Sequence, residues 1–304
     1  MTITNFGSLN LDNVYQVEHF VAPGETISCI ALDRFCGGKG LNQSIALSRY
    51  GVSVRHAGCI GHDGAPLKEM LKLNNVDCSM LLEIESDTGH TVIQVDKTGQ
   101  NNIIVYGGSN RKLTEQYVQE VMKHAKPGEM LLMQNETNLG SYIACMAKQQ
   151  GMTVALNPSP IDDYLLKDFP LDNVDIFLIN EIEASALTGC SDPDKAAVDL
   201  LERFPSARIV LTLGSGGVLY RDKEQRCTHG IYDVQVVDTT AAGDAFTGFF
   251  LGSLASGKPI SECLEIGSMA AGLSVSARGA ADSIPTINEV MEKRGVMRYL
   301  DVIS

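Results

Sequence analysis

The sequence has no tryptophan, no basic residue before Arg34, and no apolar run that approaches the ~18 residues needed to span a bilayer. We therefore expect the start of the chain to be neither a secretory signal nor a transit peptide. Basic residues are also in deficit, with 24 against 37 acidic ones and a formal net charge of −13. This balance argues against nucleic acid and anionic membranes as partners, because both carry negative charge.

The eight cysteines form no C-x-x-C pair and no cluster with histidine. Such a distribution is typical of buried, reduced thiols rather than of disulfides or zinc ligands, and it predicts a cytoplasmic protein. A length of 304 residues is long for one small domain and short for two large ones. We therefore expect a single α/β core with a minor appendage.

Strand-like and helix-like segments alternate regularly from residue 114 onwards. The patterns predict helices over 114–124, 138–150, 181–188 and 194–203, and strands over 129–133, 152–156, 174–179 and 208–213. Before them we expect strands over 3–6 and 52–60, a helix that follows the glycines of the stretch 36–44 and ends near Tyr50, and a helix over 65–73. This alternation is typical of a parallel sheet covered by helices on both faces. Segments 14–35 and 91–106 read as β-structure outside it.

Several polar residues follow predicted strands, where the carboxyl ends of a parallel sheet bind ligands. Asn10 and Asp12 follow the first strand, although these residues alone favour a turn rich in Asn and Asp. Glu136 follows the strand 129–133. Asn180 and Glu183 could line a site or could simply cap a helix. The glycine-rich stretch 212–217 suits a nucleotide, but a hairpin turn explains it as well.

The stretch 36–44 places paired glycines directly before a helix, which permits close approach of the backbone to a ligand. Lys39 and Asn42 are three residues apart and share a helical face that could hold a polyhydroxylated ligand. The spacing is not that of a Walker A loop. A near match at 252–259 fails because Pro259 replaces the hydroxyl residue and the segment ends a helix instead of starting one.

The stretch 236–250 joins a predicted strand end to a helix through a turn of small residues. The unpaired amides at the start of that helix could bind phosphate or a developing oxyanion. Asp244 then lies in the first helical turn. It could be an ordinary helix-start residue, favoured by the helix dipole, or it could accept a proton from an attacking hydroxyl group.

The order and spacing of these motifs resemble the PfkB-type carbohydrate kinases, and within that family the ribokinase group. The matching segments are GSLNLD (7–12), GGKGLNQS (37–44), LNPSP (156–160), NEIEA (180–184), TLGSGG (212–217) and VDTTAAGDAFTG (237–248). The last segment is the most specific. The resemblance implies a three-layer α/β/α core with a mostly parallel sheet. It also implies a β-sheet lid, built from segments of about 13–35 and 89–107, that commonly forms a homodimer interface.

The same resemblance implies transfer of the γ-phosphate of ATP to a primary hydroxyl of a small sugar, most readily D-ribose. Asp244 would be the catalytic base, and the amides of Ala241, Ala242 and Gly243 the anion hole. With Asp244, the implied sugar ligands are Asn10, Asp12, Gly38, Lys39, Asn42 and Glu136. The implied ATP ligands are Asn180, Thr212, Leu213, Gly214, Ser215, Gly216, Gly217, Gly243 and Ser268.

Two metal ions are implied as well. Glu183 would act on magnesium and its waters. A monovalent cation, potassium, would be held by Asp238, Thr240, Ser274, Ala277, Gly279 and Ser283, several of them through backbone carbonyls.

Three residues depart from the family pattern. Leu41 stands where a small alanine is usual, and Asn135 where an apolar residue is common, so either could reshape the sugar pocket. Ser268 stands where some relatives place a histidine near the adenine.

The alternatives are a nucleoside kinase, or a kinase of another pentose or ketohexose, within the same family. A sugar-binding regulatory protein without turnover is disfavoured by the intact Gly243–Asp244 pair and by Glu183. A Rossmann dehydrogenase is disfavoured because no G-x-G-x-x-G follows the first strand.

Overall fold

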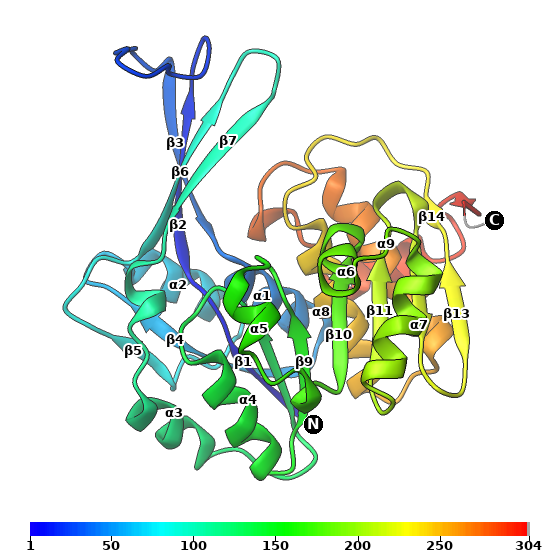
Figure 1. Ribbon diagram of the computed structural model, residues 1–304. Coiled ribbons are helices and arrows are strands. Elements are labelled where there is room, and N and C mark those ends of the chain that lie inside the picture. The colour runs from blue at the N-terminus through cyan, green and yellow to red at the C-terminus, as the bar shows by residue number, and fades with distance from the viewer. Residues whose placement is uncertain (303–304) are drawn as a thin grey trace.

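The computed structural model describes residues 1–302 and shows a large sheet between two layers of helices, with a small separate sheet projecting from it (Figure 1). The large sheet has nine strands in the order β13-β12-β11-β10-β9-β8-β1-β4-β5. Their bounds are β1 Thr2–Phe6, β4 Ser53–Ile60, β5 Leu81–Glu83, β8 Met130–Gln134, β9 Thr153–Asn157, β10 Ile176–Asn180, β11 Arg208–Thr212, β12 Val218–Arg221 and β13 Arg226–His229. All neighbours from β5 to β11 pair in parallel, and only β12 and β13 are antiparallel.

Ten α-helices are found within residues 1–302. They are α1 Lys39–Tyr50, α2 Ala65–Leu73, α3 Glu115–Met122, α4 Gly140–Gln149, α5 Asp163–Lys167, α6 Glu181–Thr188, α7 Pro193–Arg203, α8 Ala242–Ala255, α9 Ile260–Val275 and α10 Ile287–Lys293. None of these helices combines the length and the apolar character required to cross a membrane.

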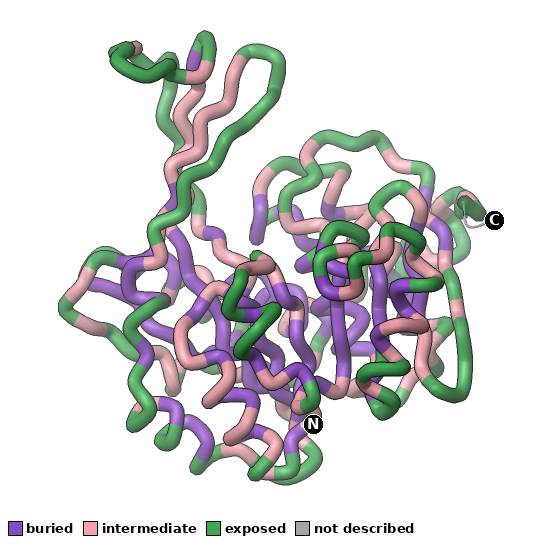
Figure 2. Tube along the Cα trace, in the orientation of Figure 1, coloured by how far each residue is buried: buried purple, intermediate pink, exposed green. Residues whose placement is uncertain are grey.

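Successive side chains of the central strands enter two different hydrophobic clusters. Leu132, Leu178 and Val210 join one cluster, which is completed by α1, α2, α8, α9 and α10. Their sequence neighbours, such as Leu131 and Phe177, join the other cluster, completed by α3 to α7. This two-residue period is that of a strand buried on both faces. Figure 2 shows the resulting buried layers along the sheet, and the three-layer α/β/α prediction is confirmed.

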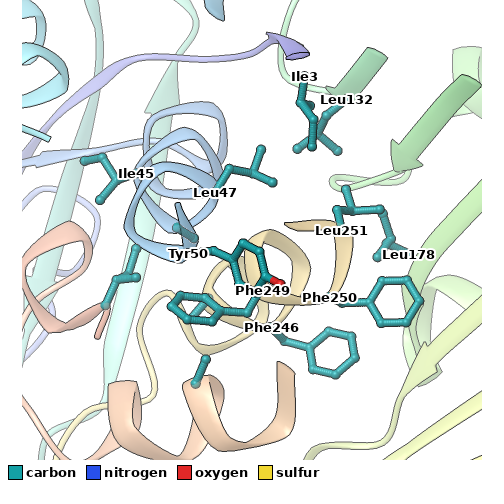
Figure 3. Close-up of a cluster of buried hydrophobic side chains, with 14 of the residues drawn as sticks. Ile3, Ile45, Leu47, Tyr50, Leu132, Leu178, Phe246, Phe249, Phe250 and Leu251 are labelled. Carbon is teal, nitrogen blue, oxygen red and sulfur yellow. The ribbon is translucent and has the colours of Figure 1, made fainter. Parts of the chain in front are cut away.

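The packing of α1 against α8 brings two distant segments close together. A Cβ atom at Gly248 would lie 2.3 Å from the Cβ of Ala46 and 2.8 Å from the amide nitrogen of Leu47. Glycine is therefore required at this crossing. Next to it, the rings of Tyr50 and Phe249 meet edge to face at 5.8 Å between centroids (Figure 3). The helices thus bring the first turn of α1 close to the first turn of α8.

The small sheet has the order β3-β2-β6-β7, with β2 Asn10–Gln16, β3 Ala31–Gly37, β6 Gly89–Val95 and β7 Asn101–Tyr106. It contains the β-structure predicted over 91–106. Of the segment 14–35 only the two ends form strands, and the prediction is wrong for 17–30, which lie outside β2 and β3. β2 pairs with β6 in parallel and with β3 in antiparallel fashion. Asn10 and Asp12 therefore lie on a strand at the base of the small sheet and not in the turn that their composition also suggested.

Most predicted elements end within two residues of the observed bounds, and Gly51 ends α1 in the left-handed conformation expected of a C-cap. The predicted strand end before Asp238 is wrong. The amides of Val237 and Asp238 donate to the carbonyl of Val275 at the end of α9, at 2.8 and 3.2 Å, and no strand passes through 233–238. The valines of this segment are typical of a strand, but its amides form hydrogen bonds to the end of a helix instead of to a neighbouring strand.

Candidate active site

Two adjoining cavities lie at the carboxyl ends of β10 and β11. The smaller cavity, of about 220 Å³, is lined by Lys39, Asn180, Glu183 and the first turn of α8. The larger cavity, of about 450 Å³, has mostly apolar walls. The residues that line both are Thr212, Thr239, Ala242, Gly243 and Phe246. The two cavities therefore form one continuous site around the start of α8.

Asp244 is buried in the first turn of α8 and is held by two side chains of α1. Its carboxylate accepts a hydrogen bond of 2.9 Å from Asn42 Nδ2 and one of 2.8 Å from Gln43 Nε2. Both donors lie on α1, the helix whose close approach to α8 requires glycine at position 248. The carboxylate thus has a fixed orientation, set by tertiary packing.

The sequence analysis did not single out Gln43, although it directly follows Asn42. The Oε1 atom of Gln43 accepts from Gln134 Nε2 at 2.7 Å, and its Nε2 also donates to Asn157 Oδ1 at 3.1 Å. The bond from Gln134 sets which end of the Gln43 amide faces Asp244. The segment GGKGLNQS was the available signal, because it places Gln43 one residue from a predicted ligand.

The start of α8 has the geometry of an anion site. Ala241 precedes the helix with φ of 62°, and no side chain caps the helix end. The amides of Gly243 and Asp244 lie in the first turn, where a helix provides no acceptor of its own. The Ala242 amide donates a long bond of 3.3 Å to the carbonyl of Thr239. A Cβ atom at Gly243 would meet no atom within 4 Å, so this glycine faces open space.

Lys39, at the start of α1, is surrounded by carboxylates. Burial alone would lower the pKa of its ammonium group, but the charges of Asp244, Glu136 and Glu183 outweigh burial and raise that pKa. The Glu136 carboxylate accepts from Ser8 Oγ and from the Lys39 amide, the latter at 3.2 Å. Burial raises the pKa of Glu136 despite these donors.

The remaining predicted sugar ligands lie nearby, at the base of the small sheet. Asp12 accepts a 2.7 Å bond from Thr91 Oγ1 of β6, and burial raises the pKa of its carboxyl group. Asn10 is buried and accepts a hydrogen bond of 2.8 Å from Asn110 Nδ2. Asn110 was not predicted from the sequence. A Cβ atom at Gly38 would lie 3.1 Å from the Asn10 amide nitrogen. The structure thus places Asn10 next to Gly38, the residue that precedes Lys39 in the sequence.

The predicted ATP ligands divide between the two cavities. Those that line the larger cavity are Thr212, Gly214, Ser215, Gly217, Gly243 and Ser268. Leu213 and Gly216 belong to the same turn, which joins β11 to β12. The hairpin-turn interpretation of 212–217 is therefore correct, and the same turn also forms part of the cavity wall.

Asn180 and Glu183 form a capping box at the start of α6. The Asn180 side chain accepts from the Glu183 amide, and the Glu183 carboxylate accepts from the Asn180 amide, both at 2.9 Å. The capping interpretation is confirmed. Both residues also line the smaller cavity, where burial raises the pKa of Glu183.

The six positions proposed for a monovalent cation gather beside the start of α8. Asp238 accepts from the amide and hydroxyl of Thr240 at 2.9 and 2.6 Å, and from the Gly279 amide at 3.1 Å. Burial acts to raise the pKa of Asp238, but these donors prevail and lower it. The hydroxyls of Ser274 and Ser283 are 2.9 Å apart, and the Ala277 amide donates to the Ser274 carbonyl.

The two unusual residues of the sugar half have clear positions. Leu41 is fully buried in the hydrophobic cluster of α1 and α8. Asn135 donates from Nδ2 to the carbonyl of Pro160 at 2.7 Å. Leu41 therefore packs into the core, and Asn135 ties the end of β8 to the loop after β9.

The chain matches the family model for pfkB family carbohydrate kinases over residues 2–287. The ribokinase of Haemophilus influenzae is 37% identical over 301 residues, which cover 96% of this chain and 97% of that protein. The crystal structure of ribokinase from Thermotoga maritima gives a TM-score of 0.88 at 33% identity, with 97% of this chain and 99% of that chain covered. The structure of Arabidopsis thaliana ribokinase complexed with ribose and ATP gives a TM-score of 0.84 at 28% identity, covering 95% of this chain and 97% of that chain.

These similarities span the large sheet, the small sheet and both cavities, and they agree with the motifs at 37–44 and 237–248. The chain therefore belongs to the pfkB family of carbohydrate kinases.

Proposed function

We propose that this sugar kinase transfers the γ-phosphate of ATP to the primary hydroxyl of D-ribose, giving ribose 5-phosphate and ADP. The observation that carries the proposal is the position of Asp244. Its buried carboxylate is held by Asn42 and Gln43 of α1 and lines the smaller cavity of about 220 Å³, beside the open amides of α8. A hydroxyl group oriented by Asp244 would face a phosphate bound at the helix start.

The chemistry requires mainly positioning and charge neutralisation, because phosphoryl transfer passes through a loose transition state in most analyses. The bond from the sugar oxygen to the γ-phosphorus forms as the bond from that phosphorus to the ADP oxygen breaks. The hydroxyl proton passes late to the Asp244 carboxylate, once the oxygen has become acidic. Lys39 and the amides of the α8 start stabilise the charge of the transferring group.

The sugar side is suited to hydroxyl groups. The Asn42 Oδ1 atom is buried and has no hydrogen-bond partner within residues 1–302, while its Nδ2 is occupied by Asp244. A sugar hydroxyl would satisfy it. The carboxylates of Asp12 and Glu136 can each accept further hydroxyl donors. This set favours a small sugar over the apolar base of a nucleoside.

We propose magnesium and potassium as the two metal cofactors. The buried Glu183 carboxylate would hold magnesium through its waters in the smaller cavity, and the ion would supply positive charge to neutralise the ATP phosphates. Asp238 would supply a carboxylate, and the paired hydroxyls of Ser274 and Ser283 would supply further oxygens, to hold potassium. An ion there would order the loop that precedes the anion site.

The small sheet is proposed to act as a lid over the sugar and as a dimer interface. Its edge strand β7 exposes Ile103, Ile104 and Val105, each more than half accessible to solvent. An exposed apolar edge strand is a template for pairing with a second chain. Sedimentation should give the mass of a homodimer, whereas a monomer at micromolar concentration would remove this interface.

A cytoplasmic location and the lack of nucleic-acid or membrane partners complete the proposal. All eight cysteines are unpaired, which suits a reducing compartment. The net charge of −13 opposes binding to polyanions.

The first prediction concerns the acceptor. In a panel of free sugars and nucleosides assayed by ADP release, D-ribose or a close pentose or ketohexose should give the highest kcat/KM. The physical reason is the polar set of Asp12, Asn42 and Glu136. A nucleoside that exceeded every free sugar would place the chain among the nucleoside kinases instead.

The second prediction concerns potassium. An ion beside Asp238 would fix the loop 238–241 without entering the chemistry, so kcat for the best sugar should be higher in potassium than in tetramethylammonium at equal ionic strength. Equal rates in both buffers would contradict the cation site. KM for the sugar serves as the internal control, because Asn10, Asp12 and Glu136 lie outside this loop.

The third prediction separates two carboxylates. Asp244→Asn keeps the size of the side chain but cannot take up the proton, so kcat should fall by about 10²-fold or more with little change in sugar affinity. Asp12→Asn weakens hydroxyl contacts present in both ground and transition states, so it should raise mainly the KM for the sugar.

Steady-state kinetics and calorimetry on both variants test this separation. Asp163→Asn is the matched control, because Asp163 is an exposed carboxylate in the first turn of α5. If Asp244→Asn retained near-normal kcat, Asp244 would be only a helix-start residue and the base would lie elsewhere.

A further inference from the structure

We infer that the C-terminal segment, with β15 (Tyr299–Leu300) at its centre, forms a wall of the larger cavity and contributes to binding the nucleotide base. The inference rests on the proposed placement of ATP in that cavity. The match to the family model ends at residue 287, before this segment begins. Nothing in the motifs at 7–248 predicted it.

The backbone of the segment is paired with a strand of the cavity wall. β15 runs antiparallel to β14 (Ile231–Tyr232), with Leu300 opposite Ile231 and Tyr299 opposite Tyr232. The Asp233 amide extends the ladder with a 2.9 Å bond to the carbonyl of Arg298. Figure 1 shows the C-terminal end of the chain next to β14. The segment is therefore held in register.

Side chains fix the segment from both sides. The Tyr299 hydroxyl accepts a 2.9 Å bond from the Gly230 amide, and the Tyr299 ring lies 4.9 Å from His229 and 5.9 Å from Tyr232 between centroids. A Cβ atom at Gly230 would lie 2.1 Å from the Leu300 carbonyl oxygen, so only glycine permits this approach. These contacts leave one docking position for β15.

Leu300 lines the larger cavity together with Ile231, Val234 and Val236, and Ala271, Gly272 and Val275 of α9 line it as well. None of these residues lines the smaller cavity, where the phosphates would lie. Such an apolar lining suits a flat aromatic base, and Ser268 of α9 adds a polar group to it. The shared residues Ala242 and Gly243 connect this base pocket to the anion site.

Substitution of Leu300 tests the inference. Leu300→Asn keeps the size of the side chain and the strand pairing but places an amide against the base. We expect the Kd for ADP and the KM for ATP to rise about tenfold, because the apolar contact of the half-buried Leu300 side chain with the base is lost. The kcat and the KM for the sugar should stay within about twofold of the parent values. Leu300→Met, which preserves the apolar surface, should bind ADP like the parent.

Val302→Asn is the matched control, because Val302 is an exposed residue of the same segment that does not line the cavity. Unchanged ADP affinity in Leu300→Asn, or an equal loss in Val302→Asn, would overturn the inference. ADP affinity is measured by calorimetry without sugar, so the result does not depend on which acceptor the enzyme uses. A parent protein that bound ADP but left ribose unphosphorylated would refute only the acceptor, whereas one that bound no ADP would refute both proposals.

Discussion

The packing of α1 on α8 is the constraint on which the rest of the site depends. Gly248 lets the two helices approach until Asn42 and Gln43 reach the carboxylate of Asp244. Any side chain at Gly248 would move α1 away from α8. It would therefore move the proposed sugar ligands of α1 away from the proposed anion site at the start of α8. The geometry of the candidate active site therefore depends on the packing of the core, because a well-packed interior transmits small displacements without absorbing them.

The same packing concentrates negative charge around Lys39. Burial raises the pKa of Asp12, Glu136 and Glu183 above the usual 3.8 and 4.5. A carboxyl group whose pKa is raised by folding stabilises the folded state while the pH is below the pKa of that group in the unfolded chain. This stabilisation is lost as the pH rises through the pKa of the group in the folded chain. At neutral pH these carboxylates therefore oppose folding. Sugar hydroxyls and a cation bound to ATP would supply the donors and charge that the free site lacks, so binding should relieve that opposition.

Local patterns were enough to predict the core, and they failed where the partner is distant in sequence. The periodicity of 114–213 gave nearly every helix and strand, since both faces of the sheet are buried and each strand has the short apolar form. Asp244, Lys39 and Glu136 were named from motifs and do meet. Gln134 and Asn110 were missed, because their roles depend on bonds to Gln43 and Asn10, at least 91 residues away. The valines of 234–237 have strand propensity, but the Val237 amide donates to a carbonyl at the end of α9 instead of to a neighbouring strand.

The position proposed for the sugar also agrees with the topology of the large sheet. The chain proceeds from β1 outward to β4 and β5, then returns to the other side of β1 with β8 and continues outward to β11. The strand order therefore reverses between β1 and β8, and the loops after these two strands diverge in opposite directions. In open α/β sheets such a switch point leaves a crevice at the carboxyl ends of the strands. Ser8 follows β1, Glu136 follows β8, and their side chains meet across that crevice. The sheet would thus direct a ligand to this point whatever the motifs were, and the motifs specify that the ligand is a sugar.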